Sequence, residues 1–260
     1  MNKYKIFKIK SKELRREVVV SVYTPKSYET SDFSYPVLYM HDGQNLFDDN
    51  LATYGKSWGI IDTYENDPSL PEIIIVGIDS IDTRTDELVP YKFIEDDDKE
   101  PVGGKAECYY DFITKNLKPI IDKNYRTLKS EKHTGVMGSS YGGLSSTYAA
   151  AKYPEFFTRF GCVSNAYYPN QDEIEKLLKN STFPTCKKFY MDSGTKEIDN
   201  EKHSKQYLKS NQSVYDILSG KIEPDKLKYM VIKDAIHNEA AWGIRFPNII
   251  KFLFSDTYKK

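Results

Sequence analysis

The segment Gly138-Ser139-Ser140-Tyr141-Gly142 has the residue types and the spacing of a turn that presents a nucleophilic serine. It follows an apolar, strand-like run at 134–137 and precedes a helix-like stretch. A sharp turn between strand and helix strains the serine backbone, so side chains do not fit two positions before or after it. Ser140 has glycines at both positions, whereas Ser139 has Met137 and Tyr141. We therefore predict Ser140 as the nucleophile, with the backbone N–H of Tyr141 at the helix N-terminus as an oxyanion donor.

A serine nucleophile needs a general base, and the chain offers four histidines. His133 precedes the strand that leads to the serine, which puts it at the amino-terminal edge, and His203 lies in a polar helical stretch. His41 comes before the serine, whereas this type of site has the order serine, acid, histidine. His237 follows the last strand-like run, at 228–233, and precedes the final helix. His237 is therefore the predicted base.

The acid that orients the histidine should lie between Ser140 and His237, just beyond a strand. Three carboxylates follow the strand-like run at 188–191, namely Asp192, Glu197 and Asp199. The side chain of Asp192, at the strand end, can point away from the histidine, while a glycine turn can aim Glu197 inwards. We favour Glu197, and Asp192 and Asp199 remain alternatives. The three roles together predict acyl transfer through an acyl-enzyme that water resolves, without a metal or an organic cofactor.

The elements that must position these groups alternate between short β-branched runs and helix-like stretches. This pattern predicts a mostly parallel central sheet with helices on both faces. The predicted strands are 17–23, 37–40, 73–78, 134–137, 161–164, 188–191 and 228–233, and the predicted helices are 106–123, 143–152, 171–179, 201–218 and 239–254. Residues 1–10 and the first strand region alternate, which favours an antiparallel edge, and Pro247 is expected to kink or split the last helix. We predict one α/β domain over residues 1–260.

Two longer connections, 79–105 and 164–170, interrupt this rhythm and are expected to form lids or binding loops. The acidic run at 95–100 lacks the spacing of a calcium loop and is interpreted as a solvated charged turn. Trp58, Tyr167 and Tyr168, with Tyr141, are candidates for an aromatic substrate pocket.

The composition excludes several other classes of function. With 37 basic and 38 acidic residues the net charge is −1, so electrostatics do not favour nucleic acid. Three scattered cysteines indicate reduced thiols rather than a disulfide framework or a metal site. No apolar stretch has the length of a signal peptide or a membrane span, so a cytoplasmic location and no membrane partner are expected. The oligomeric state is not indicated.

With these residues identified, the chain resembles the esterase D and enterochelin esterase-like branch of the α/β-hydrolases. The matching pieces are Tyr35 to Phe47 with its His41-Asp42-Gly43-Gln44 motif, Ser57-Trp58-Gly59-Ile60, Val76-Gly77-Ile78-Asp79, the serine turn, Asp192 to Glu197, and His237-Asn238-Glu239 with Trp242. The resemblance implies an α/β-hydrolase fold and a second oxyanion donor, the backbone N–H of Gln44. It also supports Glu197, because a glutamate after a Gly-Thr turn looks like the acid of the related mycolyltransferases.

One segment departs from the family pattern. Family members often have Arg-x-x-Glu-Tyr after the Gly-Ile-Asp strand, and here the stretch from Arg84 ends in Leu88.

The expected function is a serine carboxylesterase that takes acyl esters, with aromatic or hydroxycinnamoyl esters among the candidate substrates. Siderophore ester hydrolysis, S-formylglutathione-type thioester hydrolysis and acyl transfer are the enzymatic alternatives. A binding module without turnover is the non-enzymatic one.

Overall fold

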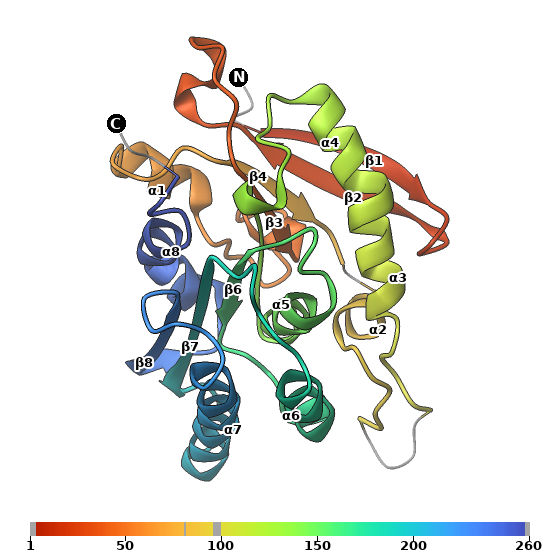
Figure 1. Cartoon of the computed structure of the whole chain (residues 1–260), viewed down its shortest axis with the longest axis vertical. Helices are drawn as coiled ribbons and strands as arrows, with labels where there is room; N and C mark the ends of the chain where they lie inside the picture. Colours follow the sequence, from red (N-terminus) through yellow and green to blue (C-terminus); the bar gives the residue numbers. More distant parts are fainter. Residues whose placement is uncertain (1–3, 81, 96–99, 258–260) are drawn as a thin grey trace.

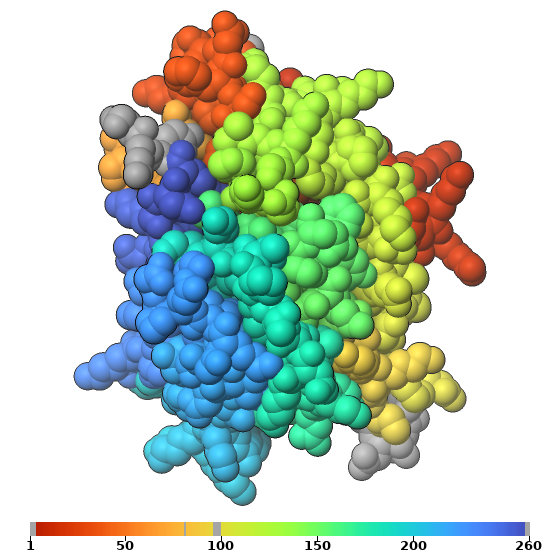
Figure 2. Space-filling model, viewed as in Figure 1, coloured from red at the N-terminus to blue at the C-terminus, as the bar shows by residue number. Residues whose placement is uncertain are grey.

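The computed structural model describes residues 4–80, 82–95 and 100–257, and within them eight strands form one sheet in the order β1-β2-β4-β3-β5-β6-β7-β8 (Figure 1). The antiparallel neighbours are β1 (Tyr4–Ser11) with β2 (Arg16–Tyr23), and β2 with β4 (Ile74–Ile78). The parallel strands that complete the sheet are β3 (Val37–His41), β5 (Thr134–Ser139), β6 (Arg159–Val163), β7 (Lys188–Lys196) and β8 (Leu227–Ile236). The antiparallel edge predicted from the alternating residues is confirmed, and the β1–β2 hairpin, in red, projects from one side of the molecule (Figure 2).

The buried strands supply alternate side chains to two apolar clusters, one on each face of the sheet. In β3, Val37 and Tyr39 belong to one cluster, and Leu38 and Met40 belong to the other. The neighbouring strands divide in the same way, because successive side chains of a strand point to opposite faces. Each fully buried aliphatic or aromatic side chain stabilises the fold by roughly 1.5–3 kcal/mol relative to exposure.

Helices cover both faces, as predicted. The bounds are α1 (Ile60–Asn66), α2 (Arg84–Leu88), α3 (Ala106–Asp111), α4 (Lys118–Asn124), α5 (Tyr141–Lys152), α6 (Gln171–Lys179), α7 (Glu201–Ser219) and α8 (Glu239–Leu253). Side chains of α3, α5, α6 and α7 enter the first cluster, and those of α1 and α8 enter the second. The chain therefore has the α/β-hydrolase arrangement.

Three local features differ from the prediction. The stretch predicted as one helix at 106–123 consists of α3, a π-helical segment (Phe112–Leu117) and α4. The short helices α1 and α2 were not expected. The last helix is not split at Pro247, since α8 runs through this position without interruption. Proline removes one backbone N–H, and the buried side chains of Phe246, Ile249 and Ile250 hold this helix against the sheet.

The connection 79–105 contains α2 and a bridge in which Phe93 and Val102 exchange backbone hydrogen bonds of 3.0 and 2.9 Å. Residues 96–99 of the acidic run, interpreted above as a charged turn, lie outside the described residues. Across the described ranges, none of the helices has the length and apolar character needed to cross a membrane.

Candidate active site

Ser140 lies in a strained turn between β5 and α5. Its backbone has φ 58° and ψ −120°, a conformation that L-residues rarely adopt. A β-carbon at Gly138 would lie 2.7 Å from Cδ2 of His41, and one at Gly142 would lie 3.3 Å from Cβ of His41. A side chain at Gly138 would therefore clash with the imidazole of His41, and one at Gly142 would be tightly packed against the same residue. Among the described residues the hydroxyl of Ser140 has no hydrogen-bond partner, and His237 is not in hydrogen-bonding contact with it.

His237 and Glu197 form a hydrogen-bonded pair at the carboxyl ends of β8 and β7. Nδ1 of His237 lies 2.7 Å from Oε2 of Glu197. The glutamate side chain is fully buried, whereas that of the histidine is 25% exposed. Burial raises the pKa of Glu197, but its hydrogen bonds and the attraction of His237 outweigh burial and hold the pKa below its ordinary value. An ionised Glu197 fixes the proton on Nδ1 and leaves Nε2 as the free base.

The two alternative acids do not reach the histidine. Asp192 is fully buried and faces Arg245, with 2.8 Å between Oδ2 and Nε. It also accepts hydrogen bonds from the hydroxyl of Tyr190 and the backbone N–H of Ser164, both at 2.9 Å. Asp199 is exposed. Of the three candidates, Glu197 is the one whose carboxylate meets the imidazole.

The backbone conformation that directs Glu197 inwards differs from the expected glycine turn. We expected a glycine turn after residue 191, but β7 continues to Lys196 and its register against β8 shifts between Gly194 and Lys196. The irregularity brings Glu197 back over the strand, where the backbone N–H of Gly194 donates to Oε1. A β-carbon at Gly194 would lie 2.2 Å from the carbonyl oxygen of Ala235, so only glycine fits.

Ser140 and the His237–Glu197 pair lie at the same edge of the sheet, because they follow the parallel strands β5, β8 and β7. The N–H of Ser140 donates to the carbonyl of Val163, and the N–H of Ala166 donates to the carbonyl of Ser140, at 2.9 and 3.2 Å. Ser164 lies between Val163 and Ala166 in the sequence. Its hydroxyl is 2.7 Å from Oε1 of Glu197. A continuous chain of contacts therefore joins the serine turn to the acid, across the parallel strands β5, β6 and β7.

The N–H groups assigned to the oxyanion are both free. Gln44 lies in a short 3₁₀ turn (Gly43–Asn45) after β3, and Tyr141 begins α5. The backbone hydrogen bonds of the described residues leave the N–H of each without an acceptor. A β-carbon at Gly43 would lie 2.6 Å from the backbone of Gly77 and Ile78, so the turn can pack this closely on β4 only with glycine there.

Charged side chains to which the sequence analysis assigned no role brace this turn. Arg84 donates from Nε and Nη2 to the two carboxylate oxygens of Asp42 at 2.8 and 2.9 Å, and Nη2 also lies 3.4 Å from the carbonyl of Ser139. On the other side Asn45 donates from Nδ2 to Glu239 at 3.1 Å. The oxyanion turn is thus linked to the serine strand by Arg84 and to the helix after His237 by Glu239.

The predicted aromatic pocket is only partly at the surface. Tyr168 is 62% exposed, and its hydroxyl lies 2.6 Å from that of Tyr141. Tyr167 is fully buried and its hydroxyl pairs with Thr147 at 2.8 Å, so it belongs to the core and does not line a pocket. Trp58 is 4% exposed and packs on Trp242, with ring centroids 5.9 Å apart.

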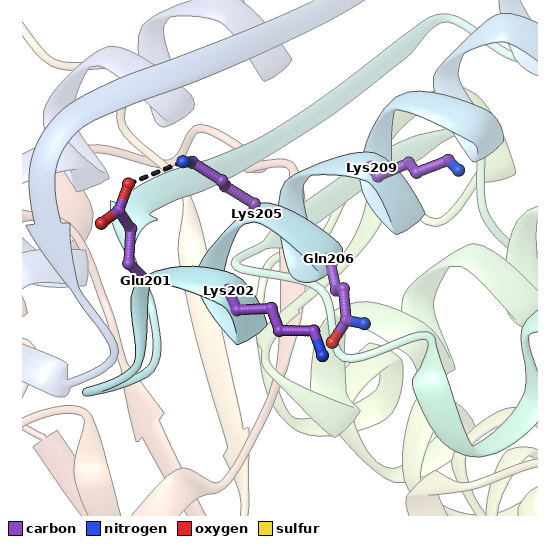
Figure 3. A pocket seen from close by; sticks show the side chains of 5 residues that line it. All are labelled: Glu201, Lys202, Lys205, Gln206 and Lys209. Atoms are coloured by element: carbon purple, nitrogen blue, oxygen red, sulfur yellow. Dashed lines mark ion pairs between the residues drawn. The ribbon is translucent and has the colours of Figure 1, made fainter.

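A hollow of about 490 Å³ lies elsewhere on the surface, over the first half of α7 (Figure 3). Its lining consists of exposed polar side chains, namely Glu201, Lys202, Lys205, Gln206 and Lys209. Lys205 pairs with Glu201 at 2.6 Å. None of the candidate catalytic residues lines this hollow.

Comparison with known proteins places this site in context. A family model described as "Putative esterase" matches residues 11–253. The uncharacterized protein YbbA of Bacillus subtilis is 28% identical over 238 residues, which cover 90% of this chain and 91% of YbbA. Among solved structures, an IroE-like serine hydrolase from Shewanella oneidensis superposes with a TM-score of 0.77 at 20% identity, covering 99% of this chain and 82% of that one. The enterobactin esterase FES from Shigella flexneri gives a TM-score of 0.76 at 20% identity, covering 98% of this chain and 59% of that one. These structures share the fold of this chain.

Proposed function

Because the chain belongs to this esterase family, we propose that it is a serine esterase in which Ser140 is the nucleophile, His237 the general base and Glu197 the acid. The single observation that carries the assignment is the 2.7 Å contact of His237 with Glu197 at the same edge of the sheet as the strained turn of Ser140. These residues come from three different strand ends and have the order in the chain that this chemistry uses.

The mechanism is a two-step acyl transfer. Nε2 of His237 accepts the proton of Ser140 as the hydroxyl oxygen attacks the ester carbonyl, and Glu197 stabilises the imidazolium that forms. The backbone N–H groups of Gln44 and Tyr141 stabilise the oxyanion, each by about 3 kcal/mol by analogy with measured donors. His237 then protonates the leaving alkoxide, and water activated by the same imidazole releases the acid and regenerates Ser140.

The nucleophile is tested with Ser140→Ala and its neighbour Ser139→Ala as the matched control. Ser140→Ala should abolish hydrolysis of a p-nitrophenyl acyl ester and covalent labelling by a fluorophosphonate. Ser139→Ala should keep both, and the label on the parent protein should map by mass spectrometry to Ser140. Hydrolysis by Ser140→Ala at the parent rate would refute the assignment. Folded parent protein that is not labelled would favour a binding module.

For the substrate, we propose small acyl or hydroxycinnamoyl esters. The exposed ring of Tyr168 lies beside Tyr141, and the guanidinium of Arg84 lies 5.4 Å from the centre of the Tyr141 ring. These aromatic side chains next to the serine turn support a substrate with an aromatic acyl group. Values of kcat/KM for acetyl, butyryl, octanoyl, feruloyl and catecholate esters and for a thioester would rank these classes, because specificity is a ratio of those values. An added alcohol that diverts the acyl group from water would instead indicate acyl transfer.

A further inference from the structure

The hydroxyl of Ser164 is the meeting point of three polar side chains next to the proposed triad. Ser164 is fully buried, directly after β6. Its Oγ lies 2.7 Å from Oε1 of Glu197, 2.9 Å from Nε1 of Trp242 and 2.9 Å from Nη2 of Arg245. All three distances are in the range of good hydrogen bonds.

The direction of these hydrogen bonds follows from the chemistry of the partners. A hydroxyl has one proton to donate and two lone pairs that accept. The indole of Trp242 and the guanidinium of Arg245 can only donate, so they occupy both lone pairs. The single proton of the Ser164 hydroxyl must therefore point at Glu197. A carboxylate oxygen that accepts this proton cannot rotate away without leaving buried donors unpaired.

The backbone of Ser164 holds the surroundings of the imidazole as well. Its carbonyl accepts a hydrogen bond of 2.5 Å from the hydroxyl of Tyr207. The rings of Tyr207 and Trp242 both contact His237 edge to face, with centroids 5.8 and 4.9 Å from the imidazole. One residue is thus bonded to the acid and to both aromatic side chains that flank the base.

We propose that Ser164 is a positioning residue of the esterase, which fixes the carboxylate of Glu197 and, through Tyr207 and Trp242, the plane of the His237 ring. This inference rests on the proposed function, because it assumes that His237 and Glu197 act on Ser140. Ser164 itself does not touch the substrate, since its side chain is fully buried. Its loss should therefore lower kcat and leave KM largely unchanged.

The kinetic test uses Ser164→Ala and Ser164→Gly, with Ser193→Ala as the matched control. Ser164 has φ 45°, which glycine adopts readily, so Ser164→Gly deletes the hydroxyl while relieving backbone strain and should fold even if Ser164→Ala does not. Ser193 is an equally buried serine on β7, and its hydroxyl donates to the carbonyl of Gly194 at 3.5 Å rather than to the side chain of Glu197. Both Ser164 variants should lose roughly 10- to 100-fold in kcat on a p-nitrophenyl ester, as expected for one hydrogen bond to a charged group. Ser193→Ala should stay within about twofold of the parent.

A pH profile and an NMR signal separate positioning from a general loss of stability. Without the Ser164 hydroxyl, the carboxylate of Glu197 loses a hydrogen-bond donor and stabilises the protonated form of His237 more strongly. The acid limb of the pH profile of kcat/KM should therefore move to higher pH. The downfield imidazole N–H resonance of His237 should shift or broaden in both Ser164 variants and stay unchanged in Ser193→Ala. Parent-like kcat, pH profile and resonance would overturn the proposal. If the parent hydrolyses no ester, the proposed function fails. In that case the NMR signal alone tests the positioning role, and an unchanged His237 resonance in both Ser164 variants would overturn it.

Discussion

Replacing His41 should change how the stability of this protein depends on pH. His41 is 2% exposed at the end of β3, with Nδ1 2.8 Å from the hydroxyl of Tyr109 and Nε2 3.3 Å from that of Tyr110. Burial lowers the pKa of this imidazole from 6.5 to about 4, an effect that Asp42 opposes and Arg84 reinforces. The folded protein therefore keeps His41 neutral beneath the serine turn.

The magnitude follows from the difference between the two pKa values. Between pH 6.5 and 4 the unfolded chain binds a proton at His41 that the folded protein does not, so the free energy of unfolding falls as the pH falls. This difference is worth about 3 kcal/mol at roughly 1.4 kcal/mol per pH unit. Asp79 acts in the opposite direction, because burial raises its pKa from 3.8 to about 6. The stability that Asp79 adds is present below pH 3.8 and is lost as the pH rises through about 6.

The assay is urea unfolding of the parent, His41→Gln and Asp79→Asn between about pH 4 and pH 7, analysed as variant minus parent at each pH. The destabilisation caused by His41→Gln should grow by about 3 kcal/mol from the acidic to the neutral end, since the variant lacks the contribution that rises with pH. For Asp79→Asn, the free energy of unfolding relative to the parent should instead increase by about 3 kcal/mol from the acidic to the neutral end of the range. His203→Gln, an exposed histidine on α7, is the control and should stay parallel to the parent. A difference between His41→Gln and the parent that does not vary with pH would refute this reasoning.

Three further outcomes are expected. Glu197→Gln should lower kcat by roughly 10²- to 10⁴-fold, because the amide favours the wrong imidazole tautomer. The kcat of Asp199→Asn, a change at an exposed position, should stay close to that of the parent. The reverse ranking of the two variants would assign the acid role to Asp199. Arg245→Met should lower the free energy of unfolding at neutral pH by about 3 kcal/mol, since it leaves the buried carboxylate of Asp192 without its ion pair. Urea unfolding should also show that the double variant Asp192→Asn/Arg245→Met recovers part of this loss. Ser140→Gly should unfold with a free energy about 1 kcal/mol above that of Ser140→Ala, because glycine relieves the strain at φ 58° and alanine retains it; equal stabilities would show that the turn is unstrained.

The parts of the fold that the sequence predicted are those with local signals. Each predicted strand has a counterpart in the sheet, because a run of apolar residues is visible within a few positions, and the glycines around Ser140 likewise led to its selection as the proposed nucleophile. His237 was selected as the proposed base by elimination among four histidines. The helix α1 was not predicted, because seven residues are too short to show a helical period. The end of β7 was also missed, since a bulge depends on pairing with β8 rather than on its own residues.

The role proposed for Ser164 could not be predicted, because all of its side-chain partners are distant in the sequence. Glu197, Trp242 and Arg245 are separated from it by 33, 78 and 81 positions. A serine at the end of a predicted strand carries no local mark that distinguishes it from any other buried serine. Only the packing of α8 against the sheet brings the indole and the guanidinium to one hydroxyl.

Backbone strain is concentrated at the edge of the sheet where these residues meet. Asp42, Ser140 and Ser164 directly follow β3, β5 and β6, and they have φ of 56°, 58° and 45°. Such conformations cost of order 1–3 kcal/mol each for residues other than glycine. Glycine would remove that cost at each position, but it would also remove the carboxylate that pairs with Arg84, the hydroxyl proposed as the nucleophile, or the hydroxyl that is hydrogen-bonded to Glu197. The strain therefore persists where a side chain is needed at a sharp bend, and the buried hydrogen bonds around each bend offset it.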